Sequence, residues 1–478
     1  MSFRCKMRAR AWCYLACVVA VLAMLASPQA TQAESYDRFE GRDTPHFAPG
    51  TSFRVEREGP RWWFVTPEGG AFLSFGVNHI SWQGDQIQHT DTRPYRDAVL
   101  AKYGTPEKWV EAACDRLRQW HFNTIGAWSK SELDGHLPRT PILHLTNSQW
   151  AECWKERRLP DFFDPAFVEL VQQRAAQIQA HASDPSVIGY FIDNELPWAP
   201  DHRRTPELFD AYAAMPGDAP GKRRFVAFFQ ERYPTVQAFN KVWEPTLPDW
   251  SALATTSKLF DRDTKKAKAD REAFTLLAAR QFFAVTSEAI RANDPDALVL
   301  GCRFIPQSVP KAVVQACGEY CDVVSVNFYE TFWGGKLFFW WKAASIDRMP
   351  QDGDLRAYYD VGKKPVMVSE FSFRARDSGM PNTWPPGYAV QPVVATQKDR
   401  AAKFDHYVMT WLSQPWFVGA HWFEHADEPK EGRANDGENG NYGLVNIEDN
   451  PYDEFVNAVA ETILNAWNAH AQATEDGI

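Results

Sequence analysis

Eight short apolar segments, separated by longer helix-like stretches, most strongly constrain the fold of this 478-residue chain. Each segment is rich in apolar and β-branched residues, as expected for a buried strand. The segments are residues 72–78, 122–126, 141–145, 187–195, 297–303, 323–328, 365–371 and 417–423. Because the sequence alternates strand-like and helix-like stretches, it predicts a parallel sheet, and eight such units predict a single (β/α)8 TIM barrel.

Two features interrupt the expected barrel. Residues 53–65 alternate around the turn Glu58-Gly59-Pro60, which predicts an N-terminal β-hairpin before the first barrel strand. A helical insertion at about 198–268 follows the fourth strand. No Ser-, Gly- or Pro-rich linker marks a second domain, so we expect an extended leader at 34–56, one catalytic barrel at 57–470 and a C-terminal tail at 471–478.

The first 33 residues resemble a processing signal rather than part of the fold. Basic residues come first, residues 15–25 are apolar but too short to span a membrane comfortably, and residues 31–33 offer a small-residue cleavage site. We therefore expect a signal peptide at 1–33 and an exported protein, periplasmic or extracellular, with no membrane contact after cleavage.

Composition narrows the possible partners. The net charge is −10 and no basic stripe stands out, which argues against a nucleic-acid partner. Most of the 20 Trp residues are expected in the core, but Trp is also the usual flat platform of sugar-binding clefts, which favours a carbohydrate substrate. Of the five cysteines that follow the signal, Cys317 and Cys321 are close enough in sequence to pair in an oxidising compartment.

Two of the apolar segments end in a glutamate, and these carry the expected chemistry. Glu195 follows residues 187–192 directly after Asn194, and Glu370 lies inside the run Val-Ser-Glu-Phe. A charge in such a run is costly unless it is paired or catalytic. The carboxyl ends of barrel strands meet at the catalytic face, where two carboxylates would form the acid and nucleophile pair of a glycosidase.

Two metal-like patterns have other interpretations. His421-x-x-Glu424-His425 matches a zinc-hydrolase pattern that requires a helix, whereas this segment has the composition of a strand. Residues 436–441 resemble a calcium loop in composition but not in ligand spacing, and we expect a loop over the substrate. The sequence therefore predicts neither a metal site nor a cofactor.

The two glutamate segments resemble clan A of the glycoside hydrolases, the retaining barrels whose catalytic residues end strands four and seven. Residues 189–195 (GYFIDNE) resemble the acid/base segment of the family 50 β-agarases, and residues 369–380 (SEFSFRARDSGM) resemble their nucleophile segment. Residues 228–243 are similar to a helical segment of the family 42 β-galactosidases. The resemblance implies that Glu195 is the acid/base and Glu370 the nucleophile.

Further substrate contacts are expected around this pair. Asn194 is placed to bind the sugar's 2-hydroxyl, and the resemblance implies that Tyr329 donates to the nucleophile and that Trp422 forms an aromatic floor. The substrate-binding candidates are Asn194, Asn78, His79, Tyr329, Trp422 and Trp198. Arg303, at the end of the fifth strand, is a weaker candidate.

The expected activity is that of a secreted retaining β-glycoside hydrolase acting on a β-linked galactan or agarose-type saccharide by double displacement. The alternatives are a β-galactosidase- or β-glucanase-like hydrolase of another β-glycan, and a carbohydrate-binding barrel without catalysis.

Overall fold

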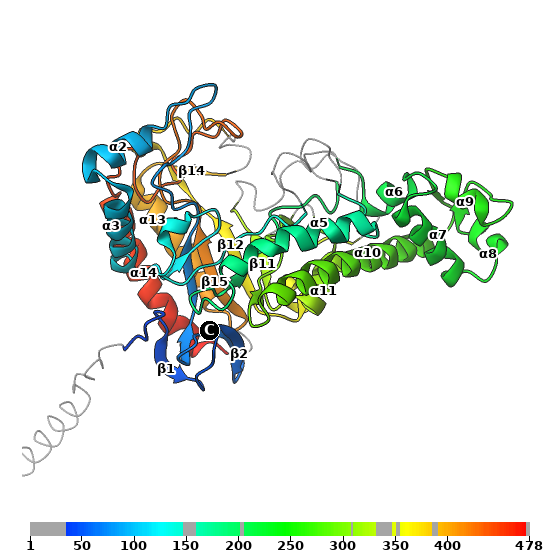
Figure 1. Ribbon diagram of the computed structural model, residues 1–478, viewed down its shortest axis with the longest axis horizontal. Helices are drawn as coiled ribbons and strands as arrows, with labels where there is room; N and C mark the ends of the chain where they lie inside the picture. Colours follow the sequence, from blue (N-terminus) through cyan, green and yellow to red (C-terminus); the bar gives the residue numbers. More distant parts are fainter. Residues whose placement is uncertain are drawn as a thin grey trace, which may run out of the picture.

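The computed structural model describes residues 35–146, 159–200, 205–306, 309–330, 347–349, 354–384 and 391–474. The chain forms a body of sheets and flanking helices from which a helical arm projects to one side (Figure 1). The expected signal peptide, residues 1–33, lies outside the described residues, as do Cys153 and the last four residues of the expected tail.

The N-terminal region forms a four-stranded antiparallel sheet in the order β1-β4-β3-β2. Its strands are Arg42–His46 (β1), Arg54–Glu58 (β2), Arg61–Val65 (β3) and Gly70–Phe72 (β4). The expected hairpin is present as β2 and β3, whose register pairs Arg54 with Val65. The turn uses Gly59 at φ +62°, a conformation that glycine adopts without steric cost. The expected leader therefore contributes β1 to this sheet.

The parallel strands that match the expected barrel strands divide into two sheets. Five of them pair in the order β11-β12-β15-β5-β6, and the remaining two pair as β10-β7. The larger sheet consists of Val324–Asn327 (β11), Val366–Phe371 (β12), Phe417–Trp422 (β15), Ser74–Val77 (β5) and Thr124–Ile125 (β6). The smaller sheet consists of Leu298–Val299 (β10) and Gly189–Tyr190 (β7).

The prediction of a single closed (β/α)8 barrel is wrong. In the described part of the chain the sheets have two to five strands, and none closes on itself. The expected third strand, residues 141–145, makes only the single bridge Ile142↔Phe191, and one further bridge, Phe304↔Val326, continues beyond β10. Pro141 lacks an amide donor, and His144 (φ 50°) leaves the extended conformation that a ladder requires.

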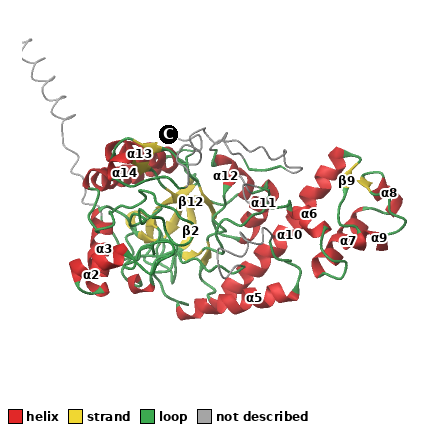
Figure 2. Cartoon of the chain, turned by 90° about the horizontal axis from the view of Figure 1, so that it is seen from above, coloured by secondary structure: helices red, strands yellow, loops and turns green. Residues whose placement is uncertain are grey.

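Helices surround the larger sheet. The long α14 packs beside α13, as Figure 2 shows, and α13 begins with a capping box in which Thr396 and Asp399 exchange hydrogen bonds. The body helices are Pro94–Tyr103 (α2), Pro106–Gln119 (α3), Pro165–Ala175 (α5), Lys311–Tyr320 (α11), Arg356–Gly362 (α12), Gln397–Leu412 (α13) and Asp453–Gln472 (α14). Short 3-10 helices (η1, η2 and η4) occupy Ser131–Leu133, Ala176–Ala180 and Arg376–Ser378, and the two-stranded pair β13-β14 occupies Arg374–Ala375 and Val393–Val394.

The expected insertion forms the projecting arm (Figures 1 and 2). Its elements are Leu208–Ala213 (α6), Pro220–Arg232 (α7), Val236–Asn240 (α8), Trp243–Glu244 (β8), Ser251–Thr255 (α9), Phe260–Asp261 (β9) and the first half of Thr264–Asn293 (α10). Buried Asp270 on α10 accepts hydrogen bonds from Tyr233 (2.5 Å) and Trp243 (2.9 Å). These bonds tie the tip of the arm to the helix that leads back to the body.

A compact apolar cluster links the parallel strands to the N-terminal sheet. It joins side chains of alternate strand positions, such as Ile188, Met367 and Val418, to Phe64 and Phe72 of the antiparallel sheet. The antiparallel sheet thus covers one end of the parallel strands, and the polar strand ends lie elsewhere. None of the helices in the described ranges combines the length and apolar character needed to cross a membrane.

Candidate active site

The two glutamates predicted from the sequence are brought together by a third residue, Asn327. Asn327 is the last residue of β11 and pairs in register with Glu370 of β12. Its side-chain amide Nδ2 donates to Glu195 Oε1 at 2.9 Å and to Glu370 Oε2 at 3.3 Å. Ser369 in turn donates to Asn327 Oδ1 at 2.8 Å, which fixes the orientation of the amide. One nitrogen therefore bridges both carboxylates.

A fully buried arginine, Arg303, hydrogen-bonds one glutamate of this pair, Glu370. Its Nη2 donates to Glu370, its Nη1 to the carbonyl of Ser369 at 3.0 Å, and its Nε to Asn194 Oδ1 at 2.7 Å. The guanidinium carbon lies 4.5 Å from the ring centroid of Trp128, a cation–π contact. Burial lowers the pKa of Arg303, although the charges of Glu370 and Glu195 oppose that shift. The arginine is therefore confined to one orientation on Glu370.

Tyr329, two residues beyond β11, donates its hydroxyl to the other oxygen of Glu370, Oε1. Burial raises the pKa of Tyr329 well above its usual value, and the charge of Glu370 acts in the same direction. The phenol therefore remains a proton donor. Glu370 thus receives Arg303 and Asn327 on one oxygen and Tyr329 on the other.

Several residues at these strand ends have a strained backbone. Glu195 (φ 52°), Arg303 (φ 47°), His79 (φ 52°) and Trp128 (φ 60°) all adopt the left-handed region, which costs a non-glycine residue roughly 1–3 kcal/mol. They follow β7, β10, β5 and β6 respectively. Such conformations concentrate at functional sites, because the surrounding structure must compensate for them. Their clustering marks this end of the sheets as the functional one.

Asn194 lies in the network, but part of its side chain is already engaged. Its Oδ1 accepts from Arg303 and from Asn327 Nδ2 (3.1 Å). Only its amide NH2 is then left to reach a sugar hydroxyl.

Three other predicted substrate contacts occupy packing positions. Asn78 is buried, donates to the carbonyl of Ser369 and accepts from the amide of Ala127, each at 2.9 Å, so it braces three strands beneath the site. Trp422 is 0% exposed and its indole donates to the carbonyl of Tyr442 at 2.8 Å. Trp198 is also 0% exposed and packs on Phe282. These three lie behind the surface of the site.

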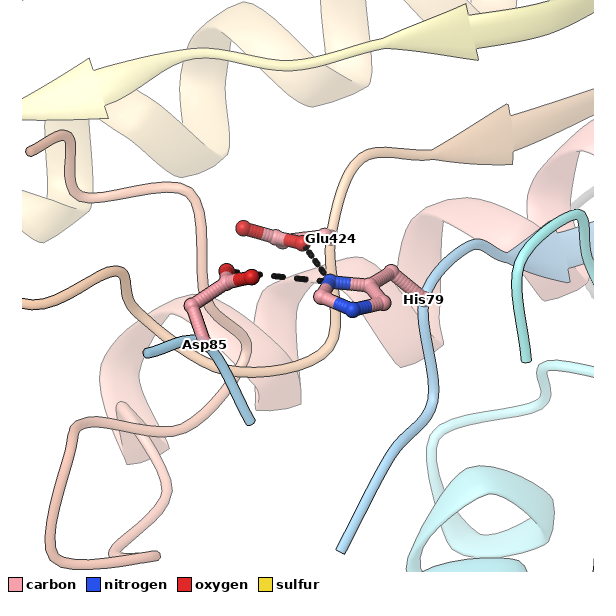
Figure 3. A group of neighbouring side chains, drawn as sticks. All are labelled: His79, Asp85 and Glu424. Carbon is pink, nitrogen blue, oxygen red and sulfur yellow. Dashed lines mark hydrogen bonds and ion pairs between the residues drawn. The ribbon is translucent and has the colours of Figure 1, made fainter. Parts of the chain in front are cut away.

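His79 lies in a second polar cluster, with Asp85 and Glu424 (Figure 3). Its Nδ1 hydrogen-bonds Glu424 Oε2 and lies 3.9 Å from Asp85 Oδ2. Burial lowers the pKa of His79, but the negative charges of Asp85 and Glu424 outweigh it and raise the pKa to about 9. The ring is thus an imidazolium near neutral pH, and its Nε2–H faces away from both carboxylates (Figure 3).

The same three residues have the composition of a metal site. One ligand atom from each lies within 4.8 Å of the others. A metal ion would have to displace a proton from His79, because a ligating imidazole nitrogen must be deprotonated. The imidazolium already supplies one positive charge between the two carboxylates, and Arg433 supplies a second one 3.9 Å from Glu424.

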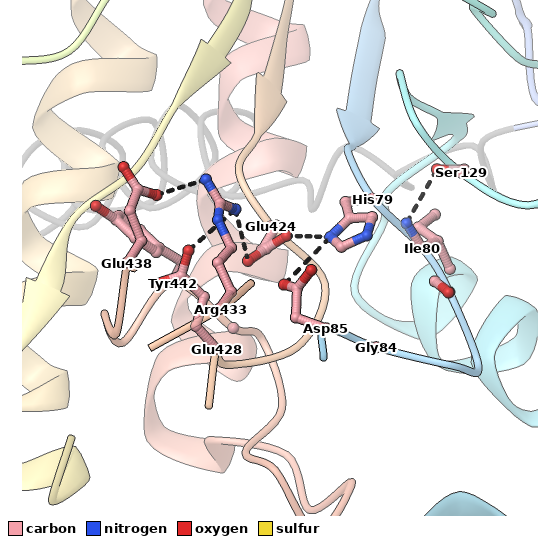
Figure 4. A network of polar contacts seen from close by, with 12 residues as sticks. His79, Ile80, Gly84, Asp85, Ser129, Glu424, Glu428, Arg433, Glu438 and Tyr442 are labelled. Atoms are coloured by element: carbon pink, nitrogen blue, oxygen red, sulfur yellow. Dashed lines mark hydrogen bonds and ion pairs between the residues drawn. The ribbon is translucent and has the colours of Figure 1, made fainter. Parts of the chain in front are cut away.

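Arg433 connects this cluster to the loop that follows β15 (Figure 4). Its ion-pair partners are Glu424 at 3.9 Å, Glu428 at 3.0 Å, Asp436 at 2.8 Å and Glu438 at 2.7 Å. The carboxylates of residues 436–441 therefore point to Arg433 rather than to a common centre, unlike a calcium loop. The His421 pattern is also resolved, because His421 lies on strand β15. Cys317 and Cys321 are not joined by a disulfide.

Comparison with known proteins was made by sequence and by structure. No family model matches the chain. The chain is 27% identical over 486 residues to beta-agarase B of Vibrio sp. (strain JT0107), covering 87% of this chain and 48% of that protein. Beta-agarase A of the same strain is 26% identical over 516 residues, covering 92% and 49%. The chain thus spans about half the length of these curated relatives.

Solved agarase structures share the fold. One agarase has a TM-score of 0.78 at 24% identity, covering 91% of this chain and 68% of that one. An exo-beta-agarase has a TM-score of 0.78 at 23% identity, covering 91% and 67%. A β-galactosidase from Halorubrum lacusprofundi reaches only 0.53 at 13% identity, covering 83% and 58%. The relatives and structural neighbours are therefore β-agarases, and the expected likeness to β-galactosidases is weak.

Sequence reasoning missed several residues of the site. Asn327 ends an apolar strand just as Glu370 does, so the signal used for the glutamates would also have found it. Trp128 follows a short strand and carries no such charge signal. The contacts of Glu424 and Arg433 could not be predicted, because both residues lie in loops and hydrophobic periodicity does not predict the path of a loop.

Proposed function

We propose that this chain is a glycoside hydrolase that cleaves a β-linked galactan of the agarose type. The sequence likeness to two β-agarases supports the substrate class, and the paired glutamates support the reaction. Because the chain spans about half of those relatives, the activity of the whole relatives enters here only as part of the proposal.

One observation carries the mechanism: Asn327 Nδ2 bonds both glutamates. Because Glu195 Oε1 and Glu370 Oε2 accept from the same nitrogen, the distance between these two oxygens cannot exceed the sum of the two donor–acceptor distances, 2.9 and 3.3 Å. Carboxyl separations of about 5–5.5 Å are typical of retaining glycosidases, and about 6.5–9.5 Å of inverting ones. The bridging amide therefore supports double displacement with retention of configuration.

The roles of the two glutamates follow from their donors. Arg303 and Tyr329 each donate to one oxygen of Glu370 and so fix the orientation of its carboxylate, which supports its role as the nucleophile. Glu370 attacks the anomeric carbon while Glu195 transfers its proton to the departing glycosidic oxygen. Glu195, now ionised, takes a proton from water, whose oxygen attacks the same carbon and displaces Glu370. Both glutamates end the cycle in their starting protonation states.

Substrate positioning involves the donors around the pair. The amide NH2 of Asn194 is proposed to bind the 2-hydroxyl, a contact that strengthens in the transition state. The Nε2–H of His79 is proposed to donate to a second sugar oxygen. Asn78, Trp422 and Trp198 position the surrounding strands and helices, as their burial indicates.

The decisive experiment replaces the nucleophile. Glu370→Ala is expected to lower turnover of agarose oligosaccharides by at least about 10³-fold. Azide should restore bond cleavage and give a glycosyl azide of inverted configuration, whereas Glu195→Ala with azide should give the retained one. The exposed Glu448→Gln is the matched control and should stay active.

Product analysis by NMR tests retention directly in the unmodified protein. First-formed hydrolysis products of the α-anomer would overturn double displacement at a β-linkage. Binding of agarose oligosaccharides without any hydrolysis would overturn the enzymatic proposal in favour of a carbohydrate-binding protein.

We further propose that residues 1–33 are removed on export and that residues 57–470 act as one catalytic unit. The basic and apolar pattern of the first 33 residues supports the first proposal. Mass spectrometry of the protein recovered from the periplasm or medium should show a mature start near Glu34. An intact N-terminus in an exported protein would contradict it.

A further inference from the structure

Two loops at the functional end of the sheets are bonded to each other along their length. One follows β12, which carries Glu370, and the other follows β15. Asn439 Oδ1 accepts from the backbone amides of Thr383 (2.9 Å) and Trp384 (3.0 Å), and Asn439 Nδ2 donates to Thr383 Oγ1 at 2.8 Å. Asn441 N donates to Asn382 Oδ1 at 2.8 Å. Residues 382–384 and 439–441 are therefore bonded into one unit, which we call the wall.

Trp384 stands out on this wall because its side chain is exposed. It is 49% exposed, and among the described residues it is the one tryptophan in the group of exposed large hydrophobic side chains, which also includes Tyr36, Leu100 and Phe260. A β-carbon added to Gly437 would lie 4.0 Å from its Cδ1, so the turn at Gly437 borders the edge of the indole. The backbone of Trp384 makes two hydrogen bonds to Asn439, because its amide donates to Asn439 Oδ1 and its carbonyl accepts from Asn439 N at 3.3 Å. The neighbouring amide of Thr383 donates to the same Oδ1.

The wall adjoins the catalytic pair. Glu438, next to Asn439, pairs with Arg433 at 2.7 Å (Figure 4). Asn441 Oδ1 accepts from the amide of Ala375 at 3.1 Å, and Asn382 Nδ2 donates to the carbonyl of Ala375 at 3.3 Å, so both loops are bonded to the chain five residues beyond Glu370. Glu428, from the same network, accepts from the amide of Gly440 at 2.6 Å. The backbone of Trp384 is thus tied, through Asn439 and Asn441, to the segment that follows Glu370.

We propose that Trp384 is a stacking platform for a sugar unit of the polysaccharide other than the one attacked by Glu370. An exposed indole costs solvation free energy unless something covers it, and the apolar face of a pyranose ring covers a flat aromatic surface well. A rigid platform loses little conformational entropy on binding. The inference rests on the proposed function, since it assumes a β-linked galactan in the cleft.

The test compares Trp384→Ala with Phe260→Ala, which removes an equally exposed aromatic ring on the distant arm. Each change is made in the full chain and in a Glu370→Gln background, so that binding is measured without turnover. The probes are agarose oligosaccharides of two to eight sugar units and a short aryl β-galactoside, which is too small to reach a second subsite.

Trp384→Ala is expected to weaken binding of the longer oligosaccharides about tenfold, in keeping with the loss of one aromatic stacking contact. Trp384→Phe should recover part of the loss, while turnover of the aryl galactoside and the melting temperature stay unchanged. Phe260→Ala should have no effect on any of these.

Equal binding of long oligosaccharides by the unmodified protein and by Trp384→Ala would overturn the platform and leave the proposed function intact. An equal loss on the aryl galactoside would also overturn it, because the residue would then act at the reactive sugar. Absence of both binding and cleavage of every oligosaccharide by the unmodified protein would overturn the proposed function, and the platform with it.

Discussion

Two arginines near the functional end of the sheets, the buried Arg303 and the half-buried Arg433, have different kinds of partners. Arg303 contacts one carboxylate, Glu370, and otherwise binds the carbonyls of Asn194 and Ser369. Arg433 has four carboxylate partners, all of which lie within ten residues of it in the sequence. The first arginine joins distant strands, whereas the second mainly organises its own loop.

The difference shows how similar residues serve different purposes. Around Arg303, one cation contacts Glu370, and one amide, that of Asn327, contacts both glutamates. Around Arg433, four carboxylates pair with one cation. These ion pairs hold the shape of the loop that borders the site. We therefore expect the Arg303 cluster to control the reaction and the Arg433 cluster to control stability and shape.

The largest effects should come from removing each arginine. Arg303→Met and Arg433→Met should each lower the free energy of unfolding by about 3–5 kcal/mol, because each leaves buried carboxylates without their partner. Only Arg303→Met should also lower kcat, by about 10²-fold or more, in protein that is still folded. Urea denaturation and turnover measured on the same samples separate the two effects. Equal losses of kcat would remove the distinction between the clusters.

The second-largest effect on kcat is expected at Asn327, whose side-chain amide bridges the two glutamates. Asn327→Ala should lower kcat by about 10²–10³-fold, because it removes a preorganised donor from both carboxylates. Asn240→Ala is a matched control, since Asn240 also makes two hydrogen bonds, to the amide and carbonyl of Leu247 in the arm. The control should change the melting temperature but not kcat. A similar kcat in both variants would show that the bridge is dispensable.

A smaller effect is the pH dependence of stability caused by His79. Its pKa is raised from an ordinary 6.5 to about 9 in the folded protein, so it binds its proton more tightly when folded. This contribution is fully present below about pH 6.5 and is lost as the pH rises through 9, and it amounts to about 3 kcal/mol at most. Relative to His79→Asn, the unmodified protein should therefore lose stability between pH 6.5 and 9.5. Parallel stability curves for the two proteins would contradict the raised pKa.

The smallest effect is expected at Asp85. Asp85→Asn should lower the pKa of His79 below 9 by about one unit, because the charge of Asp85, 3.9 Å from Nδ1, is the largest of the contributions that raise it. An NMR titration of the His79 ring measures the shift, with the exposed Asp91→Asn as control. An unchanged pKa would show that Glu424 alone holds the proton.

Much of the strand arrangement was predictable, and its closure was not. The apolar runs ending at Asn327, Phe371 and Trp422 are strands within a few residues of the expected bounds, because burial on both faces produces a continuous apolar run. The run at 141–145 gave the same signal but forms no regular strand, since Pro141 and the left-handed His144 interrupt the ladder. The apolar pattern shows which residues are buried, but it does not show which strands are hydrogen-bonded to each other. The sequence therefore could not show that the barrel does not close.

The sequence by itself determined that Glu195 and Glu370 end apolar strands, that an N-terminal hairpin precedes them and that a helical insertion follows Glu195. These are local properties, written in the order of apolar, polar and turn-forming residues. Only the tertiary structure decided that Asn327 bridges the two glutamates, that Arg303 and Tyr329 hold Glu370, and that Trp422 is enclosed while Trp384 is exposed. Those contacts join residues tens to more than a hundred positions apart, and side-chain packing, which no local pattern encodes, sets their geometry.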